Sequence, residues 1–236
     1  MSNELWGCFA TQSFELKLGT EGAIKKLKGS QATALTPQSR EAATSYLKPI
    51  MSDYPPLRIA GIEPESFVDG PGIRLTVFTQ GCHHNCPGCQ NPQTHDFAGG
   101  HFIEREAIIT MIKENPLLDG VTFSGGDPMD QAAALVPLAR EIKERGLNLV
   151  IFTGYTYEQL IKLTPEKPEL FELLSFADIL IDGPFVMAKK SLELKFRGSW
   201  NQRIIDVQKS LVEGHVVIHQ IQLDEMAEHP DREYNT

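Results

Sequence analysis

The sequence predicts an α/β fold in which strands alternate with helices around one sheet. Three observations carry this prediction. Short apolar, β-branched runs alternate with amphipathic segments from residue 57 onward. Polar and Gly-rich motifs directly follow several of these runs. The 236 residues are 41% hydrophobic, enough for one core and an appendage. Because this alternation gives parallel βαβ units, we expect four to six units in an incomplete barrel or an open twisted sheet.

The predicted strands are short and apolar. The first has the length of an edge strand, and the second is rich in β-branched residues. The strands are expected at residues 57–62, 73–79, 120–124, 147–152, 177–181, 204–207 and 216–218.

The predicted helices carry an apolar stripe and recognisable end signals. Ile108, Ile109 and Ile112 share one face of the first helix, and Gly146 closes the second. Prolines separate the last two. The helices are expected at residues 104–114, 130–145, 157–163 and 168–174.

The charge balance excludes some classes of partner. The formal net charge is −9, with a net +2 on residues 1–50 and therefore −11 on the remainder. This acidic balance argues against a nucleic-acid surface. No run of 18 apolar residues predicts a membrane span, and the first residues lack a secretory pattern. We expect a cytoplasmic protein with no nucleic-acid or membrane partner.

Residues 1–50 differ in composition from the rest. They are rich in small and polar residues, and a new start is indicated at Met51. The predicted division is an N-terminal extension at 1–50 and a main domain at 51–236. The extension has three interpretations: a disordered segment, a small partner-binding appendage, or sequence upstream of a true start at Met51. Cys8 lies here and is interpreted as an incidental free thiol.

Three of the four cysteines fall within eight residues, as Cys82-x3-Cys86-x2-Cys89. They follow the strand predicted at 73–79, so this strand delivers them to a loop at its carboxyl end. Glycines and prolines between residues 81 and 92 keep that loop out of regular structure. The loop can therefore direct three thiolates toward one place.

The spacing alone leaves several ligands open. Zinc would need a fourth ligand, for which His83, His84 and His95 are candidates. An iron–sulfur cubane would keep one iron without a protein ligand. A disulfide with a spare thiol is a third interpretation, although the low cysteine count gives no sign of an oxidising compartment.

Further motifs follow the later strands. They occupy residues 124–128, 153–155 and 182–185, and the carboxylates of Asp127 and Asp182 stand among them. In parallel α/β folds, ligands bind at the carboxyl ends of the strands. The motifs are therefore expected at one rim of the sheet, together with the cysteine loop.

The cysteine spacing is the signature of the radical S-adenosylmethionine (SAM) superfamily, which this chain resembles. The ordered set of motifs at 69–74, 81–91, 124–128, 153–155, 182–185 and 197–202 resembles the glycyl radical activases. The closest likeness is to the subgroup acting on anaerobic ribonucleoside-triphosphate reductase. The resemblance covers residues 57–207. In the wider superfamily, an aromatic residue often precedes the third cysteine. This chain has Gly88 there, which is what the subgroup shows.

The resemblance implies a partial (β/α)6, TIM-like barrel of the radical SAM type and an oxidoreductase activity. Cys82, Cys86 and Cys89 would bind three irons of a [4Fe-4S] cluster, and SAM would bind the fourth. Reductive cleavage of SAM would then generate a glycyl radical on the reductase. Gly88, Cys89 and Gln90 are implied to line the cluster loop and touch SAM.

The later motifs have implied roles as well. Gly125, Gly126 and Asp127 would hold the SAM amino group, with Asp127 in place of the more usual Glu. We further hypothesise that Asp182 orients the methionine part of SAM, directly or through a cation. Two interpretations remain for Arg74 and the segment 197–203. They could serve partner docking or closing of the SAM site, or they could simply pack against the rest of the protein.

The implied partners are the class III ribonucleotide reductase and an electron donor such as flavodoxin or ferredoxin. Alternatives are an activase of another glycyl radical enzyme, a small radical SAM enzyme, and a non-catalytic iron–sulfur or zinc module. A fourth nearby cysteine would favour the module, and the sequence around the loop has none.

Overall fold

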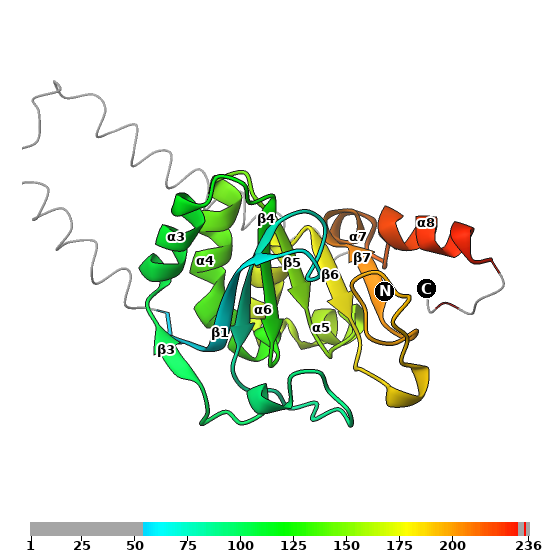
Figure 1. The fold of residues 1–236 in the computed structure, drawn as a ribbon, viewed down its shortest axis with the longest axis horizontal. Helices are drawn as coiled ribbons and strands as arrows, with labels where there is room; N and C mark the ends of the chain where they lie inside the picture. The colour runs from blue at the N-terminus through cyan, green and yellow to red at the C-terminus, as the bar shows by residue number, and fades with distance from the viewer. Residues whose placement is uncertain (1–53, 231–233, 235–236) are drawn as a thin grey trace, which may run out of the picture. The chain divides into compact units, whose positions relative to one another are not determined.

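The computed structural model describes residues 54–230 and Tyr234. Residues 1–50, with Cys8 and the proposed start at Met51, lie outside the described residues. Within the described part, one sheet has the strand order β3-β1-β2-β4-β5-β6-β7 (Figure 1). The strands are β1 (Leu57–Ser66), β2 (Arg74–Thr79), β3 (His101–Ile103), β4 (Gly120–Gly125), β5 (Asn148–Phe152), β6 (Ile179–Asp182) and β7 (Arg203–Asp206).

The four central strands β2, β4, β5 and β6 are parallel, which confirms the predicted βαβ organisation. Antiparallel strands flank them: β1 and β3 at one side, β7 at the other. The fold is therefore a mixed α/β sheet of seven described strands.

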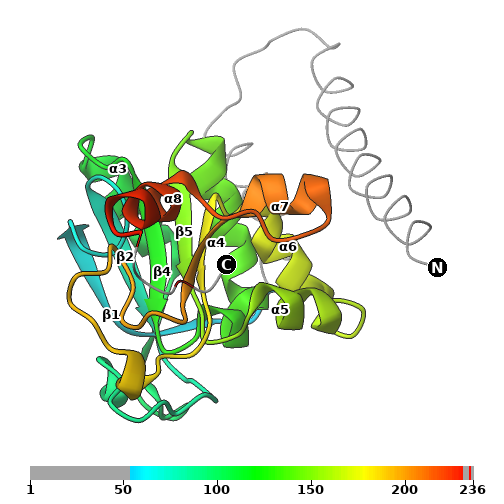
Figure 2. The same cartoon turned by 90° about the vertical axis from the view of Figure 1, so that its right-hand side faces the viewer.

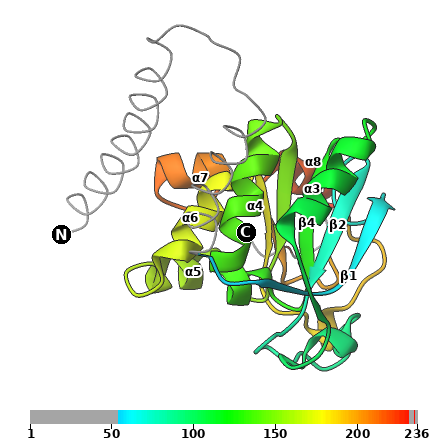
Figure 3. The same ribbon diagram turned by 90° about the vertical axis from the view of Figure 1, so that its left-hand side faces the viewer.

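Most of the helices cover one face of this sheet, where most of the core lies (Figure 3). The helices are α3 (Arg105–Glu114), α4 (Ala132–Glu144), α5 (Tyr157–Leu163), α6 (Pro168–Phe176), α7 (Val207–Glu213) and α8 (Gln220–Glu228). Alternation along the strands sends Leu149 and Ile151 toward this face and Val150 toward the other. On that other face, Ile221 of α8 packs against a smaller cluster around Val150. Figure 2 shows α8 on the opposite side of the sheet from helices α4, α5, α6 and α7.

Several details differ from the expected elements, which did not include β3, α7 or α8. β1 runs to Ser66, beyond the predicted end at 62. β7 lies where a strand was predicted but is antiparallel, because the connection from β6 contains only a 3-10 turn at Met187–Lys189 and returns on the same side. The strand predicted at 216–218 is wrong: Ile218 makes a single bridge to Ile205.

The parallel arrangement brings the predicted motifs to one edge. The carboxyl ends of β2, β4, β5 and β6 lead into the cysteine loop, the Gly125–Asp127 turn, the Thr153–Tyr155 turn and the segment after Asp182. In Figure 1 these loops lie along the lower edge, with the cysteine loop in teal and the segment 183–202 in gold.

Arg74 lies at the opposite edge, at the start of β2. Its side chain is fully buried and donates to Thr122 Oγ1 and to the carbonyls of Pro71, Val121 and Asn148 at 2.6–3.1 Å. Burial lowers the pKa of Arg74 to about 10, partly offset by nearby carboxylates. Arg74 therefore joins the amino ends of three strands and has no place at the motif edge.

No helix in the described part of the chain is both long enough and apolar enough to cross a membrane.

Candidate active site

The cysteine loop begins two residues after β2 ends. Cys82, Cys86 and Cys89 are free thiols, each partly buried. Gly81 and Gly88 adopt φ values of 100° and 76°, which side chains other than glycine rarely adopt. The loop returns to its own base, where the Gly81 amide donates to the Thr94 carbonyl at 2.7 Å. The predicted irregular, folded-back loop is confirmed.

A cavity of about 560 Å³ opens at this edge of the sheet. Most of the predicted motifs contribute to its wall, which supports their placement at one rim. Its lining includes Cys82, Cys86, Cys89, Gln90, Ser124, Gly125, Gly126, Thr153, Gly154, Gly183, Phe185, Arg197, Gly198 and Gln202. Of the predicted site residues, Gly88, Asp127 and Asp182 do not line it.

The three thiols fit the predicted cluster. Among the described residues, no group of three or more His, Cys, Asp or Glu side chains is placed to hold one metal ion. In a cubane, each thiolate binds a different iron, so the sulfurs need not converge on one point. Two of the histidines considered as zinc ligands lie against carboxylates, His83 at Asp130 and His84 at Asp127.

Two of the three thiols favour the protonated form in the absence of metal. Burial raises the pKa of Cys82 and of Cys86 above the ordinary value of a thiol. Because metals bind the thiolate, loading the loop with iron must release these protons.

Gly125 and Gly126 let the β4 turn approach the cysteine loop. A Cβ on Gly126 would lie 2.2 Å from the Gly81 carbonyl oxygen, and one on Gly125 would lie 2.6 Å from the Thr79 nitrogen. The amides of Gly126 and Asp127 donate to Thr79 and Gly81, each at 2.8 Å. Glycine is therefore required at both positions for the two loops to touch.

Asp127 is fully buried below the cavity rather than in its wall. Its carboxylate accepts hydrogen bonds from the Met129 amide at 3.0 Å and from Thr153 Oγ1 and the Gly154 amide at 2.9 Å. His84 Nε2 lies 2.9 Å from Oδ2, although its N–H is not aligned as in an ideal hydrogen bond. The carboxylate raises the pKa of His84, against the effect of burial. A direct contact of Asp127 with SAM stays a prediction.

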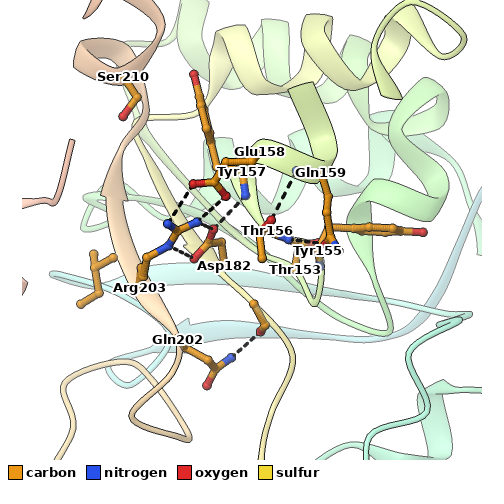
Figure 4. A network of polar contacts seen from close by, with 12 residues as sticks. Thr153, Tyr155, Thr156, Tyr157, Glu158, Gln159, Asp182, Gln202, Arg203 and Ser210 are labelled. Atoms are coloured by element: carbon orange, nitrogen blue, oxygen red, sulfur yellow. Dashed lines mark hydrogen bonds and ion pairs between the residues drawn. The ribbon is translucent and has the colours of Figure 1, made fainter. Parts of the chain in front are cut away.

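Asp182 is also buried and already paired (Figure 4). It accepts from the Tyr157 amide at 2.8 Å and from Nε of Arg203 at 3.0 Å, with a second, shorter contact to Nη2. Arg203 reaches on to both oxygens of Glu158 at 2.8 and 3.0 Å. These contacts join the ends of β6 and β7 to α5. The predicted contact of Asp182 with SAM or a cation stays a prediction.

Residues 68–205 match the family model described as "4Fe-4S single cluster domain". The anaerobic ribonucleoside-triphosphate reductase-activating protein of Vibrio cholerae is 35% identical over 149 residues, which span 60% of this chain and 92% of that protein. The chain belongs to this activating-protein family.

Other relatives agree in kind. The Escherichia coli protein of the same name is 31% identical over 147 residues, covering 59% of this chain and 92% of its own length. The pyruvate formate-lyase-activating enzyme of Clostridium pasteurianum is 40% identical over 116 residues, covering 45% of this chain and 49% of that enzyme. Among solved structures, QueE from Escherichia coli aligns with a TM-score of 0.35 at 18% identity, covering 48% of this chain and 56% of that one.

In this member of the activating-protein family, the segment 197–203 builds one wall of the cavity. The Gly198 and Ser199 amides donate to Gln202 Oε1 at 2.9 and 3.1 Å, and Gln202 Nε2 donates to the Gly183 carbonyl at 3.1 Å. The Arg197 side chain is buried and paired with Glu225 of α8. The motif that sequence analysis left open therefore shapes the cavity.

Sequence reasoning missed part of the cavity wall. Phe67 and Val68 from the β1–β2 connection, Phe152 at the end of β5, and Leu192 and Phe196 from the segment before β7 also line it. Single apolar residues in loops carry no periodic signal. Only their neighbourhood to the motifs at 69–74 and 197–202 could have indicated them.

Glu158 lies at the exposed end of the row of ion pairs Asp182–Arg203–Glu158, and its contribution to stability is expected to depend on pH. Hydrogen bonds from Arg203 lower the pKa of Glu158 to about 2, from an ordinary value of 4.5. A lowered folded pKa gives stability that is present above pH 4.5 and lost as the pH falls toward 2. Because the side chain is 59% exposed, we expect Glu158→Gln to cost less than about 1 kcal/mol at neutral pH.

Thermal melts of the wild type and Glu158→Gln across the acid range check this. The two melting temperatures should converge as the pH falls below 4.5. A difference that stays constant or widens on acidification would contradict the prediction.

Proposed function

We propose that this chain is the activating enzyme of an anaerobic ribonucleoside-triphosphate reductase. It would use a [4Fe-4S] cluster and SAM to place a radical on a glycine of that reductase. The observation that carries the proposal is the gathering of three free thiols on the wall of a 560 Å³ cavity, in a chain of the activating-protein family. Bound together, the two cofactors supply a one-electron cleavage of SAM, whose products are methionine, 5′-deoxyadenosine and a glycine that has lost a hydrogen atom.

The residues have distinct proposed tasks. Cys82, Cys86 and Cys89 hold three irons, and Gln90 lies on the same wall of the cavity. Gly125 and Gly126 line the cavity and present their backbone to SAM. Neither position has room for a side chain, which would meet the backbone of the neighbouring cysteine loop or of β2.

The remaining proposed cofactor residues lie outside the cavity wall. Gly88 has a φ of 76°, which other residues rarely adopt, and a Cβ there would lie 1.9 Å from Met187 Cε, so the Met187 side chain would have to move away from the loop. Asp127 and Asp182 are proposed to serve SAM binding from below, by holding the turns that reach the cavity.

Two structural proposals accompany this function. The open mixed sheet, with most of its helices on one face and its cavity among the carboxyl-end loops, supports an interpretation as a partial (β/α)6 barrel of the radical SAM type. The division into an extension at 1–50 and a catalytic domain at 51–236 is likewise proposed. A flavodoxin or ferredoxin is the proposed electron donor, in the cytoplasm.

A protein substrate is supported by the mouth of the cavity. Phe67, Val68 and Leu192 line it while 66%, 76% and 90% exposed. Exposed apolar side chains beside a cavity are typical of a surface that a partner covers. A small substrate would instead favour a closed pocket with convergent polar groups.

This mouth yields a test of docking. Leu192→Asp should lower the glycyl radical yield on the reductase about tenfold, since covering a leucine contributes roughly 1.5–3 kcal/mol. The variant's SAM cleavage without reductase should fall much less. Val212→Asp on α7 is the matched control, because Val212 is 88% exposed and does not line the cavity. Equal losses in both variants would contradict docking at the mouth.

Anaerobic electron paramagnetic resonance tests the function itself. The reconstituted, reduced protein is mixed with SAM and the reductase. A glycyl doublet that requires SAM is the expected result. A doublet on pyruvate formate-lyase but not on the reductase would redirect the proposal to another glycyl radical enzyme. A colourless protein holding zinc would overturn it in favour of a metal-binding module.

A further inference from the structure

Three loops at the carboxyl edge meet at one buried carboxylate. Asp127 lies on the β4 turn and accepts from Thr153 and Gly154 of the β5 turn. His84, between the first two cysteines, contacts the same carboxylate at 2.9 Å. One side chain thus joins the cysteine loop to both turns that line the cavity beside it.

Packing fixes the His84 ring as well. A Cβ on Gly154 would lie 2.4 Å from the ring, so only glycine leaves room for it there. Tyr155 meets the ring edge-on, with centroids 4.5 Å apart. The side chain of His84 is 19% exposed. These contacts hold Nε2 at 2.9 Å from Oδ2 of Asp127, close enough for an electrostatic contact although the N–H is not aligned for an ideal hydrogen bond.

The neighbouring His83 makes a weaker version of the same contact. Its Nδ1 lies 2.9 Å from Asp130, whose other oxygen accepts from Tyr155 Oη at 3.0 Å. The His83 side chain is 68% exposed, so water screens this contact, although the Asp130 side chain is only 4% exposed. His84 is therefore the principal tie.

The cysteine loop needs such a tie. It has no regular structure, and Asn85 adopts a positive φ of 45° next to His84. Its base is held at Gly81 and Cys82 by backbone hydrogen bonds. Between Cys82 and Cys86, His84 connects the loop to the buried Asp127.

We propose that His84 is a positioning residue that fixes the Cys82–Cys86 segment against the turn of Gly125 and Gly126. It would set the distance between the cluster and SAM without binding either. The short Asp127 suits this role, because its carboxylate stays below the cavity and within reach of His84. This inference rests on the proposed cluster site and adds a residue of the cavity wall that supports it.

The test uses the two amide substitutions at His84. Glutamine can place its amide nitrogen near the position of Nε2, whereas asparagine reaches only the position of Nδ1. The full-length variants are reconstituted anaerobically, and iron release to a ferrous chelator is followed. The spectrum of the reduced cluster is recorded with and without SAM.

We expect His84→Asn to release iron about tenfold faster than the wild type, as for other residues that orient metal ligands. Its SAM-induced spectral change should be lost or reduced. His84→Gln should stay within about threefold of the wild type, since it restores the donor. His101→Asn, on the exposed edge strand β3, is the matched control and should behave as the wild type.

Two outcomes would overturn the inference while the proposed function stands. One is wild-type iron release by His84→Asn, and the other is equally fast release by His84→Gln, which would assign the effect to ring packing. A wild-type protein that binds no cluster would overturn the proposed function and this inference with it. Circular dichroism monitors folding, and His84→Leu replaces His84→Asn should the latter not fold.

Discussion

Replacing Cys86 by alanine is expected to abolish glycyl radical formation on the reductase. Cys86 supplies one of the three thiols at the cavity, and the described residues hold no cysteine besides these three that could replace it. Since changes in residues that merely orient metal ligands cost 10–100-fold, loss of a ligand should exceed about 100-fold. Electron paramagnetic resonance of the reconstituted protein with SAM and reductase measures the doublet.

Cys8→Ala is the matched control, since it removes the same side chain outside the cysteine loop. It should retain the cluster signal and the doublet. A normal doublet in Cys86→Ala would refute the assignment of the three thiols. Loss of the doublet with a full cluster signal would restrict the role of Cys86 to a later step.

Replacing Arg203 by methionine is expected to destabilise the fold strongly. It would leave the Asp182 carboxylate, 1% exposed, without its cationic partner. Removing one partner of a buried pair costs about 3–5 kcal/mol. For a domain of this size, the melting temperature should fall by roughly 10 °C.

The double variant with Asp182→Asn separates charge from packing. It removes the uncompensated carboxylate while an amide oxygen can still accept from Tyr157, so it should recover at least half of the lost stability. Arg140→Met is the control, because its pair with Glu172 is exposed and should contribute under about 1 kcal/mol. A loss in Arg203→Met no larger than in the control would contradict the argument.

The strand and helix alternation was predictable where burial is periodic. β4, β5 and β6 are apolar and bounded by turn residues, and α3 shows Ile108, Ile109 and Ile112 on its buried face. α8 was not predictable, because its buried residues are Gln222 and Glu225. These bind the Ile204 amide and the Arg197 guanidinium, partners far from α8 in sequence.

The site was predictable in its location but only partly in its contacts. Parallel strands place their carboxyl ends together, so Cys82 and Gly125 were expected near one another, and both line the cavity. That Asp182 would turn to Arg203 depends on β7 being antiparallel, which the sequence did not indicate. The pairing of Asp127 with His84 depends on loop geometry, which leaves no periodic pattern.

The hydrophobic core has a consequence for how the protein is assembled and repaired. Of the described residues, none between Val77 and Ile108 is among the buried members of the core. The metal-binding loop therefore contributes no buried residue to the hydrophobic core, which is formed by other parts of the described chain. Small zinc domains, in contrast, unfold when stripped of metal. Here oxygen damage would leave an intact apoprotein, and iron and sulfide could be delivered to it again without new synthesis.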